Sequence, residues 1–444
     1  MHRVDILGYK LNYNMVKTQA NLSVFIETHG CKLNQADAMK LANEFQDSGF
    51  TVSDTSTKAD VYILNTCTVT HVADSKARHS VRSFKKQNSN AKVIVTGCYA
   101  ERAQRELELM PEIDIVMGNM KKKDIVETVI DEFNYNYLTI DTNDSRGFSS
   151  SRTRAMLKIQ EGCNQICSYC IVPKVRGREK SISLDDLVSN INSFTDIGFK
   201  EVVLTGTQLG SYGFDLEGID LTKMISGILE NTDIERLRIS SLQPQELTQE
   251  LISLWEDDRL CPHFHIPLQS GNDYILGKMR RKYTSRMYLE AVENVRNSVE
   301  NVSITTDVIV GFPGETQAYY EDTRRICEMV GFADMHVFKF SSRPGTSAAY
   351  YQDDVVPKVK NERSAELISI GQDSFAKFRQ SYHGKKMNVL WETTEKNIVK
   401  GSFYSGLTSN YIRVTSNKVK KENSLESVTL MFNTKDPYGS MDIN

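Results

Sequence analysis

From Ser23 to about Phe133, short apolar runs rich in Val and Ile alternate with amphipathic stretches. The apolar runs have the length and β-branched content of buried strands, and the amphipathic stretches have the periodicity of helices. Alternating strands and helices favour a mainly parallel sheet that is covered by helices. The pattern therefore predicts an N-terminal open parallel α/β domain over residues 21–133.

A polar, turn-rich and aperiodic segment over residues 134–151 predicts a linker. Beyond it, six strand patterns alternate with helical stretches: RAMLKIQ, KEVVLTG, RLRIS, HFHIPL, VSITTDVIVGF and DMHVFKF. Six such repeats over roughly 220 residues favour a partial, open (β/α)6 barrel over a closed eightfold one. We place this second α/β domain at residues 152–382, with its active site at the C-terminal rim.

From about Gly384 the pattern changes to short β segments separated by Gly, Ser and Asn turns. The segments MNVLWE, NYIRVT and SVTLMF predict a small C-terminal β-barrel over residues 383–444. This tail carries a mild excess of basic residues, and small barrels often bind RNA through basic grooves. The same excess is typical of a plain solvated surface, so both interpretations stay open.

Composition narrows the class of protein. The chain has 444 residues, of which 40% are hydrophobic and 25% charged, as in a globular protein of two or three domains. Its net charge of −3 gives no global sign of nucleic-acid binding, so any RNA contact must be local. No apolar run is long enough for a membrane span, and the N-terminus lacks the apolar core of a signal peptide. We therefore expect a cytoplasmic protein without membrane contact.

The eight cysteines are too sparse for a disulfide framework, and a cytoplasmic chain keeps them as thiols. Three of them stand close together in EGCNQICSYCIVP, where Cys163, Cys167 and Cys170 have a C-x3-C-x2-C spacing. Cubane iron-sulfur clusters normally take four thiolates, so a trio leaves one iron open to a substrate or cofactor. A structural zinc loop with a distant fourth ligand is the alternative.

A second trio of cysteines follows three strand patterns of the first domain. SVFIETHGC, ADVYILNTC and AKVIVTGC place Cys31, Cys67 and Cys98 just beyond the strand ends. Ligands of open α/β sheets bind outside the carboxyl ends of the strands, so these cysteines should converge on one rim. A single cysteine there is more often a small buried apolar residue, but three at equivalent positions predict a second site. Cys261 and Cys327 have no partner spacing, and we interpret both as structural.

The motifs HGCKLNQAD, NTCTVT, VTGCYAER and EGCNQICSYCIVPKVRGRE together resemble the radical S-adenosylmethionine (SAM) methylthiotransferases, over nearly the whole chain. The resemblance implies a methylthiotransferase N-terminal domain, a radical SAM barrel and a C-terminal TRAM domain. It also implies SAM and two [4Fe-4S] clusters, one auxiliary and one that binds SAM. The implied ligands are Cys31, Cys67 and Cys98 for the auxiliary cluster, and Cys163, Cys167 and Cys170 for the SAM-bound cluster.

Interior motifs distinguish the branches of this family. LTGTQLGSYGFD, RLRISSLQPQE, HIPLQSGNDYILGKMRRKYT, TTDVIVGFPGET and HVFKFSSRPGTSAA are similar to the branch that acts on N6-threonylcarbamoyladenosine at position 37 of tRNA. The N6-isopentenyladenosine branch usually carries a GQNV-type turn where this chain has Gly206-Thr207-Gln208-Leu209, and a third branch modifies an aspartate of a ribosomal protein. The resemblance thus implies methylthiolation of C2 of the threonylcarbamoyl nucleoside, with the tRNA anticodon loop and a reducing partner. The oligomeric state stays open.

After Arg176-Gly177-Arg178 the family commonly continues with a Ser-Arg pair, which this chain lacks. The departure puts a basic residue at that spot in doubt and leaves the cluster ligands unaffected. An alternative of another class is a non-enzymatic iron-sulfur or zinc protein that binds RNA, with its six cysteines purely structural. Iron content and reductive SAM cleavage distinguish the two classes.

Further residues are candidates for cofactor binding. The loop after the strand that contains Asp307 has glycines that let the backbone approach a ligand closely, and we assign Gly311, Gly314 and Glu315 to SAM. A plain strand-to-helix turn is the alternative.

Polar residues near the predicted sites complete the candidates. His263 and His265 alternate on one strand with Gln269 nearby, and they either face the barrel interior or are satisfied core histidines. Basic residues near the two cysteine trios either contact tRNA phosphates or form solvated faces. These residues are Arg78, Arg82, Lys85, Lys86, Arg152 and Arg154.

Overall fold

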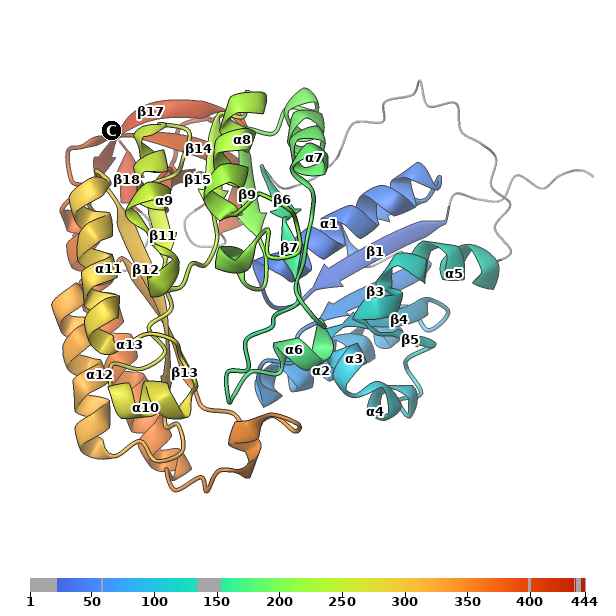
Figure 1. Ribbon diagram of the computed structural model, residues 1–444. Coiled ribbons are helices and arrows are strands. Elements are labelled where there is room, and N and C mark those ends of the chain that lie inside the picture. The colour runs from blue at the N-terminus through green and yellow to red at the C-terminus, as the bar shows by residue number, and fades with distance from the viewer. Residues whose placement is uncertain are drawn as a thin grey trace, which may run out of the picture.

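The computed structural model describes residues 22–56, 59–133, 153–397, 401–434, 436 and 441–443. In Figure 1 the N-terminal sheet is blue, the central sheets run from green to orange, and the C-terminal barrel is red. The predicted linker at residues 134–151 and the candidate Arg152 lie outside the described residues. The residue limits of the three domains stay predictions.

The N-terminal sheet is parallel throughout, in the order β2-β1-β3-β4-β5. Alternate residues of the central strand β3 point into two separate apolar clusters, because helices cover both faces of the sheet. The predicted open parallel α/β fold is therefore confirmed. The strands are β1 (Ser23–Thr28), β2 (Thr51–Ser53), β3 (Val61–Thr66), β4 (Lys92–Gly97) and β5 (Ile115–Met117). The helices are α1 (Lys32–Asp47), α2 (His71–Gln87), α3 (Cys98–Arg102), α4 (Gln104–Glu108), η2 (Asn119–Asp124) and α5 (Ile125–Glu132).

The central unit has the six strands that the sequence predicted, all parallel, in two sheets of order β6-β9-β10 and β11-β12-β13. Isolated bridges, Leu237 to Leu260 and Ser241 to His265, join the two sheets into one curved wall. Among the described residues no pairing closes β13 onto β6, so the barrel is partial, as expected. The strands are β6 (Arg154–Lys158), β9 (Glu201–Thr205), β10 (Arg236–Ile239), β11 (His263–His265), β12 (Ser303–Val310) and β13 (Asp334–Lys339).

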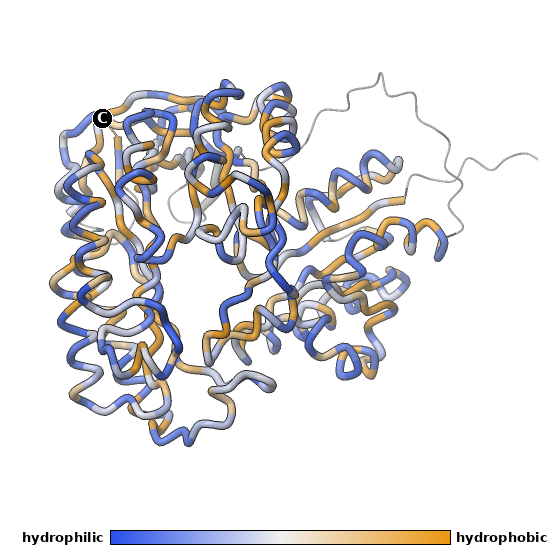
Figure 2. The backbone as a smooth tube through the Cα atoms, in the orientation of Figure 1, coloured by the Kyte–Doolittle hydropathy of each residue, from blue (hydrophilic) through white to orange (hydrophobic). Residues whose placement is uncertain are grey.

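Amphipathic helices cover the outer face of this wall, and their alternation of apolar and polar residues is visible as orange and blue in Figure 2. Along β12, Ile304, Val308 and Val310 belong to the apolar core beneath the helices. Thr305 and Asp307 alternate with them and therefore face the inside of the barrel. The main helices are α7 (Leu184–Asp196), α8 (Leu221–Asn231), α9 (Gln249–Ser253), α11 (Ser285–Ser298), α12 (Gln317–Val330) and α13 (Pro357–Gln380). None of the described helices combines the length and the apolar character needed to cross a membrane.

The C-terminal strands form a closed barrel in the order β14-β15-β16-β18-β17, around the fully buried Trp391. The sequence predicted three of these strands and missed β15 and β18, since β15 shows little apolar alternation and β18 is only three residues long. The strands are β14 (Lys386–Asn397), β15 (Gly401–Thr408), β16 (Arg413–Ser416), β17 (Leu425–Met431) and β18 (Met441–Ile443).

The C-terminal barrel docks against the N-terminal ends of the central strands. Arg236 of β10 donates hydrogen bonds to the carbonyls of Leu407 and Thr408 at 3.1 and 3.0 Å. Arg238 donates to the carbonyl of Ser409 at 2.9 Å. These bonds position the following turn, which carries Tyr411, at the base of the partial barrel.

Candidate active site

The cysteines of the first trio meet at the carboxyl edge of the N-terminal sheet. Cys67 directly follows β3 and Cys98 directly follows β4, while Cys31 is the N-cap of α1, slightly farther from its strand. A Cβ added to Gly30 (φ +101°) would lie 2.7 Å from the Cβ of Cys67, so this loop passes directly over Cys67. The structure thus brings together the three cysteines that the strand pattern placed on one rim.

Burial raises the pKa of the Cys67 thiol to about 11, and the neighbouring Cys31 and Cys98 raise it too. Cationic and polar groups surround the same trio. Asn119 donates to the Sγ of Cys98 at 3.6 Å. Burial lowers the pKa of Arg176, but Cys98 raises it more than any other neighbour does, and the net shift is upward. A positively charged metal group bound there would favour the thiolate form of these cysteines.

The second trio lies in the loop between β7 (Gln160–Glu161) and α6 (Val172–Val175). Burial raises the pKa of Cys163 to about 11 and that of Cys170 to about 12, and Cys167 raises both. In the described part of the chain, each trio has at least one pair of sulfurs that are more than 4.8 Å apart. Two sulfurs on one Zn2+ are at most about 4.6 Å apart, because each bond is about 2.3 Å. Neither trio is therefore gathered around a single ion in this structure.

The second cysteine loop is held by residues that are distant in the sequence. Ser168 donates from its N–H to the carbonyl of Met279 at 3.0 Å and from its hydroxyl to the carbonyl of Lys278 at 2.8 Å. Arg281 has an Nη1 atom 3.4 Å from the Sγ of Cys167. This guanidinium lies where it can balance the negative charge of a bound thiolate.

Arg281 continues into a polar chain that ends at a partly buried carboxyl. It donates to the side-chain oxygen of Gln243 at 2.8 Å, Gln243 donates to Gln208, and Gln208 donates to Glu246. Glu246 also accepts from the N–H of Gln243 at 2.8 Å. Burial nevertheless dominates and raises the pKa of Glu246 to about 7.

This shift predicts that stability falls as pH rises through neutrality. The folded pKa of Glu246 is above its usual value of 4.5, so its contribution is complete below pH 4.5 and is lost as pH rises past 7. We expect a loss of about 3 kcal/mol in the free energy of unfolding across this window. Urea unfolding at several pH values checks it: Glu246→Gln should flatten the slope, whereas the exposed control Glu250→Gln should keep it. An unchanged slope in Glu246→Gln would contradict the prediction.

The inner face of the barrel carries a row of polar residues from three adjacent strands. The Nδ1 of His265 lies 2.9 Å from the hydroxyl of Thr305, and its Nε2 lies 3.3 Å from Asp307. His336 of β13 contacts the other oxygen of Asp307 at 3.2 Å. These contacts hold the pKa of Asp307 well below its usual range despite burial. The Nε2 of the buried His263 lies 3.2 Å from the same Thr305 hydroxyl, so both histidines belong to this inward-facing polar row.

The glycine loop after β12 is closed by its own glutamate. Glu315 accepts from the N–H of Gly311 at 2.8 Å and from Arg363 at 2.6 Å, and Gly311 and Gly314 have φ of +71° and +86°. Phe312, within this loop, makes an edge contact with Tyr169 of the second cysteine loop, with ring centroids 6.5 Å apart. The loop thus lies beside the second trio, but its carboxylate shapes the turn and does not face outward.

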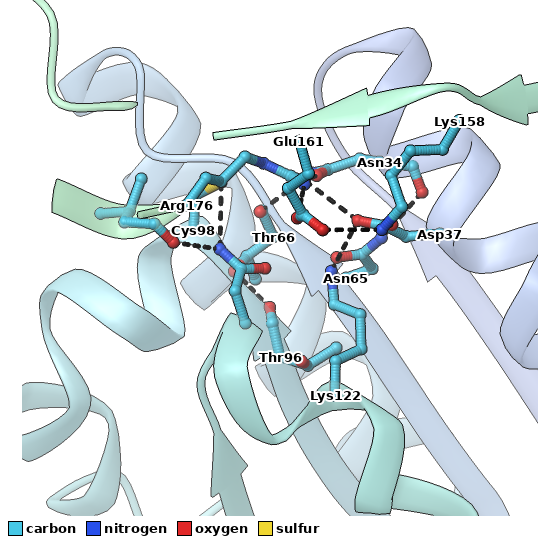
Figure 3. Close-up of polar contacts among 12 residues, drawn as sticks. Asn34, Asp37, Asn65, Thr66, Thr96, Cys98, Lys122, Lys158, Glu161 and Arg176 are labelled. Atoms are coloured by element: carbon cyan, nitrogen blue, oxygen red, sulfur yellow. Dashed lines mark hydrogen bonds and ion pairs between the residues drawn. The ribbon is translucent and has the colours of Figure 1, made fainter. Parts of the chain in front are cut away.

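A charged cluster joins the N-terminal sheet to the barrel (Figure 3). Asp37 of α1 accepts from Lys122 at 2.9 Å, from Lys158 at 2.8 Å and from Arg176 at 3.1 Å. Arg176 also donates to Glu161 at 2.6 Å. The positive neighbours hold the pKa of Asp37 well below its usual range although burial opposes them. The cluster fixes the first cysteine trio against the barrel that carries the second.

Most of the basic candidates for RNA contact are engaged within the protein. Arg78 donates to Glu106 at 3.2 Å, and Lys85 pairs with Asp114 at 2.9 Å. The other pairs join Arg82 to Glu112 at 3.7 Å and Arg154 to Glu392 at 2.9 Å. Lys86 is exposed, and contact of these residues with tRNA stays a prediction. Cys261 and Cys327 are both buried, each with 1% of its surface exposed, in line with a structural role.

Residues 23–118 match a family described as uncharacterized protein family UPF0004, and residues 157–327 match the radical SAM superfamily. The threonylcarbamoyladenosine tRNA methylthiotransferase MtaB of Bacillus subtilis is 34% identical over 88% of this chain and 90% of the relative. The chain belongs to the radical SAM methylthiotransferase family. The prediction of an enzyme of this class is thereby confirmed, and such enzymes use SAM and a [4Fe-4S] cluster.

Other relatives in this methylthiotransferase family are named for a different substrate. The tRNA-2-methylthio-N(6)-dimethylallyladenosine synthase of Clostridium novyi is also 34% identical, over 86% of this chain and 88% of the relative. A solved radical SAM methyltransferase, TsrM from Kitasatospora setae, shares the fold with a TM-score of 0.53 at 15% identity, over 74% of this chain and 77% of that one. Overall identity therefore shows the family and does not separate its branches.

Proposed function

We propose that this methylthiotransferase acts on N6-threonylcarbamoyladenosine at position 37 of tRNA and adds a methylthio group at C2. The product would be 2-methylthio-N6-threonylcarbamoyladenosine. The observation that carries methylthio transfer is the presence of two separate cysteine trios, one at the rim of each α/β unit, joined by the Asp37 cluster. One trio alone would account for SAM cleavage, and the second is available for the sulfur that the transfer requires. The choice of nucleoside rests on the interior motifs described above. The names of the relatives, which are tRNA methylthiotransferases, support tRNA as the substrate.

We assign the two trios to two [4Fe-4S] clusters. Cys31, Cys67 and Cys98 would hold the auxiliary cluster, and Cys163, Cys167 and Cys170 the cluster that binds SAM. With two SAM molecules bound, the two clusters would supply the radical chemistry and the sulfur. Both are needed to replace the unactivated C2 hydrogen of adenine.

The protein's own residues would balance the charge of the thiolates, bind SAM and exclude water from the site. Arg281 beside Cys167 and Arg176 near Cys98 place positive charge next to the thiolates. For the SAM site we keep Gly311, Gly314 and Glu315 as candidates: the backbone of the two glycines would face SAM, and Glu315 would hold the turn in shape. Tyr169 packs this turn against the second cysteine loop and excludes water from their junction.

The reaction needs a reducing partner, and we infer a cytoplasmic enzyme because a tRNA substrate supports that location. The C-terminal barrel is a candidate surface for the anticodon arm, because loop bases can be splayed out without opening a duplex.

Mass spectrometry of tRNA nucleosides tests the substrate. In cells that lack this gene, 2-methylthio-N6-threonylcarbamoyladenosine should disappear, and it should return when the gene is restored. Loss of the isopentenyl counterpart alone would instead assign the chain to that branch. That branch is the second candidate, because a dimethylallyladenosine synthase is equally similar to this chain. No change in either nucleoside would contradict a tRNA substrate and favour the ribosomal-protein aspartate.

A further inference from the structure

Lys32 is the residue after Cys31 and the first of α1, and its side chain reaches toward the inside of the barrel. Its Nζ lies 5.6 Å from the centroid of the Tyr411 ring. Tyr411 in turn stacks on His263, at the start of β11, with ring centroids 4.5 Å apart. The ammonium of Lys32 thus lies between the first cysteine trio and the inner face of the barrel.

The other cations around this point have anionic partners. Arg238 pairs with Glu201 at 2.7 Å and Arg154 pairs with Glu392 at 2.9 Å, while the Nδ1 of His336 lies 3.2 Å from Asp307.

Lys32 itself has no carboxylate partner and no hydrogen bond among the described residues, although its side chain is half-buried. Its ammonium instead faces the aromatic ring of Tyr411. Keeping a charge in such a place is costly unless an opposite charge joins it. The ammonium is therefore available to an anion that arrives with the substrate.

The chemistry of the proposed substrate supplies such an anion. In adenine, C2 and C6 flank N1, so a substituent on N6 lies on the same edge of the ring as the carbon that is modified. A nucleoside whose C2 faces the first cysteine trio would present this substituent to the residues beside the trio, and Lys32 directly follows Cys31. The threonylcarbamoyl group carries a carboxylate, whereas an isopentenyl group has no polar atom.

We propose that Lys32 binds the carboxylate of the substrate's N6-threonylcarbamoyl group and so selects a nucleoside with an acidic N6 substituent. The inference rests on the proposed function. Lys32 is then a specificity-determining residue that the isopentenyl substrate would leave without a partner. An ammonium and a carboxylate paired in a partly desolvated site contribute both affinity and discrimination.

The first test compares Lys32→Gln with the wild type, both with reconstituted clusters, on tRNA that carries N6-threonylcarbamoyladenosine. Loss of one partner of a desolvated charge pair should raise KM by about 30-fold or more. Iron content and SAM cleavage without tRNA should not change. Lys32→Arg should recover much of the loss, and Lys40→Gln, on the same helix but 74% exposed, should behave as the wild type.

A change on the substrate keeps the test decisive even if Lys32→Gln loses iron. Converting the threonyl carboxylate to its methyl ester should raise the wild-type KM by a similar factor, and the ester should cost Lys32→Gln nothing further. An unchanged KM for Lys32→Gln with full iron, or a wild type that tolerates the ester, would overturn the assignment of Lys32 alone. A wild type that modifies only isopentenyladenosine tRNA would overturn the proposed function, and this inference with it.

Discussion

Cys67→Ala should abolish methylthio transfer while SAM cleavage continues, whereas Cys167→Ala should abolish both. Each substitution removes one of three thiolates from a different trio, and a cluster with two protein ligands is not retained. Product formation should fall below detection in both variants. Iron should fall from about eight to about four atoms per chain, because each cubane holds four.

The two readouts separate the roles of the trios. Mass spectrometry of tRNA nucleosides measures transfer, and 5'-deoxyadenosine formation in reductant measures SAM cleavage. Cys327→Ala is the matched control, since this cysteine is buried in the core and distant in sequence from both trios; it should keep full iron and product. Cys67→Ala that retained eight irons and transfer would contradict the auxiliary assignment. Stoichiometric zinc without SAM cleavage in the wild type would favour a structural role for both trios.

Asp37→Asn should lower the midpoint of thermal unfolding by about 6 to 12 °C, the effect of about 3 kcal/mol in a domain of moderate size. Asp37 accepts from Lys122, Lys158 and Arg176. Its loss leaves Lys158 and Arg176 with Glu161 as their remaining acidic partner in the cluster, and it removes the ion-pair partner of Lys122. Breaking a buried charge group by removing one member is far more costly than exchanging an exposed charge.

Asp47→Asn makes the same change on the exposed end of the same helix, and it should shift the midpoint by less than about 1 °C. The wild-type contribution of Asp37 should persist at all pH values above the ordinary Asp range and be lost only as pH falls well below it, because its folded pKa is lowered. Equal midpoints for the two variants would show that the cluster does not hold the units together. Cluster iron in Asp37→Asn, compared at low temperature, would show whether the first trio depends on that contact.

The sequence by itself determined the α/β class, the six central strands and the cysteine trios, because these depend on local signals. Buried parallel strands must be continuous runs such as VYILNT, and a cysteine directly after such a strand must lie at the sheet edge. Family membership followed from the same short motifs. Two strands of the C-terminal barrel, β15 and β18, escaped prediction; β18 has only three residues and gains its stability from neighbouring strands.

Only the tertiary structure decided which polar residues work together. Asp37 and Arg176 are separated by 139 residues, and no local pattern connects them. Tyr411 reaches the base of the barrel through a turn with φ of +73°, in a segment that the sequence marked only as a strand. Charge pairing also engages Arg154 and Arg78 within the protein, whereas Lys32 forms no ion pair with the carboxylates of the described residues. Such pairings depend on long-range packing, which sets the distances on which electrostatic energies depend.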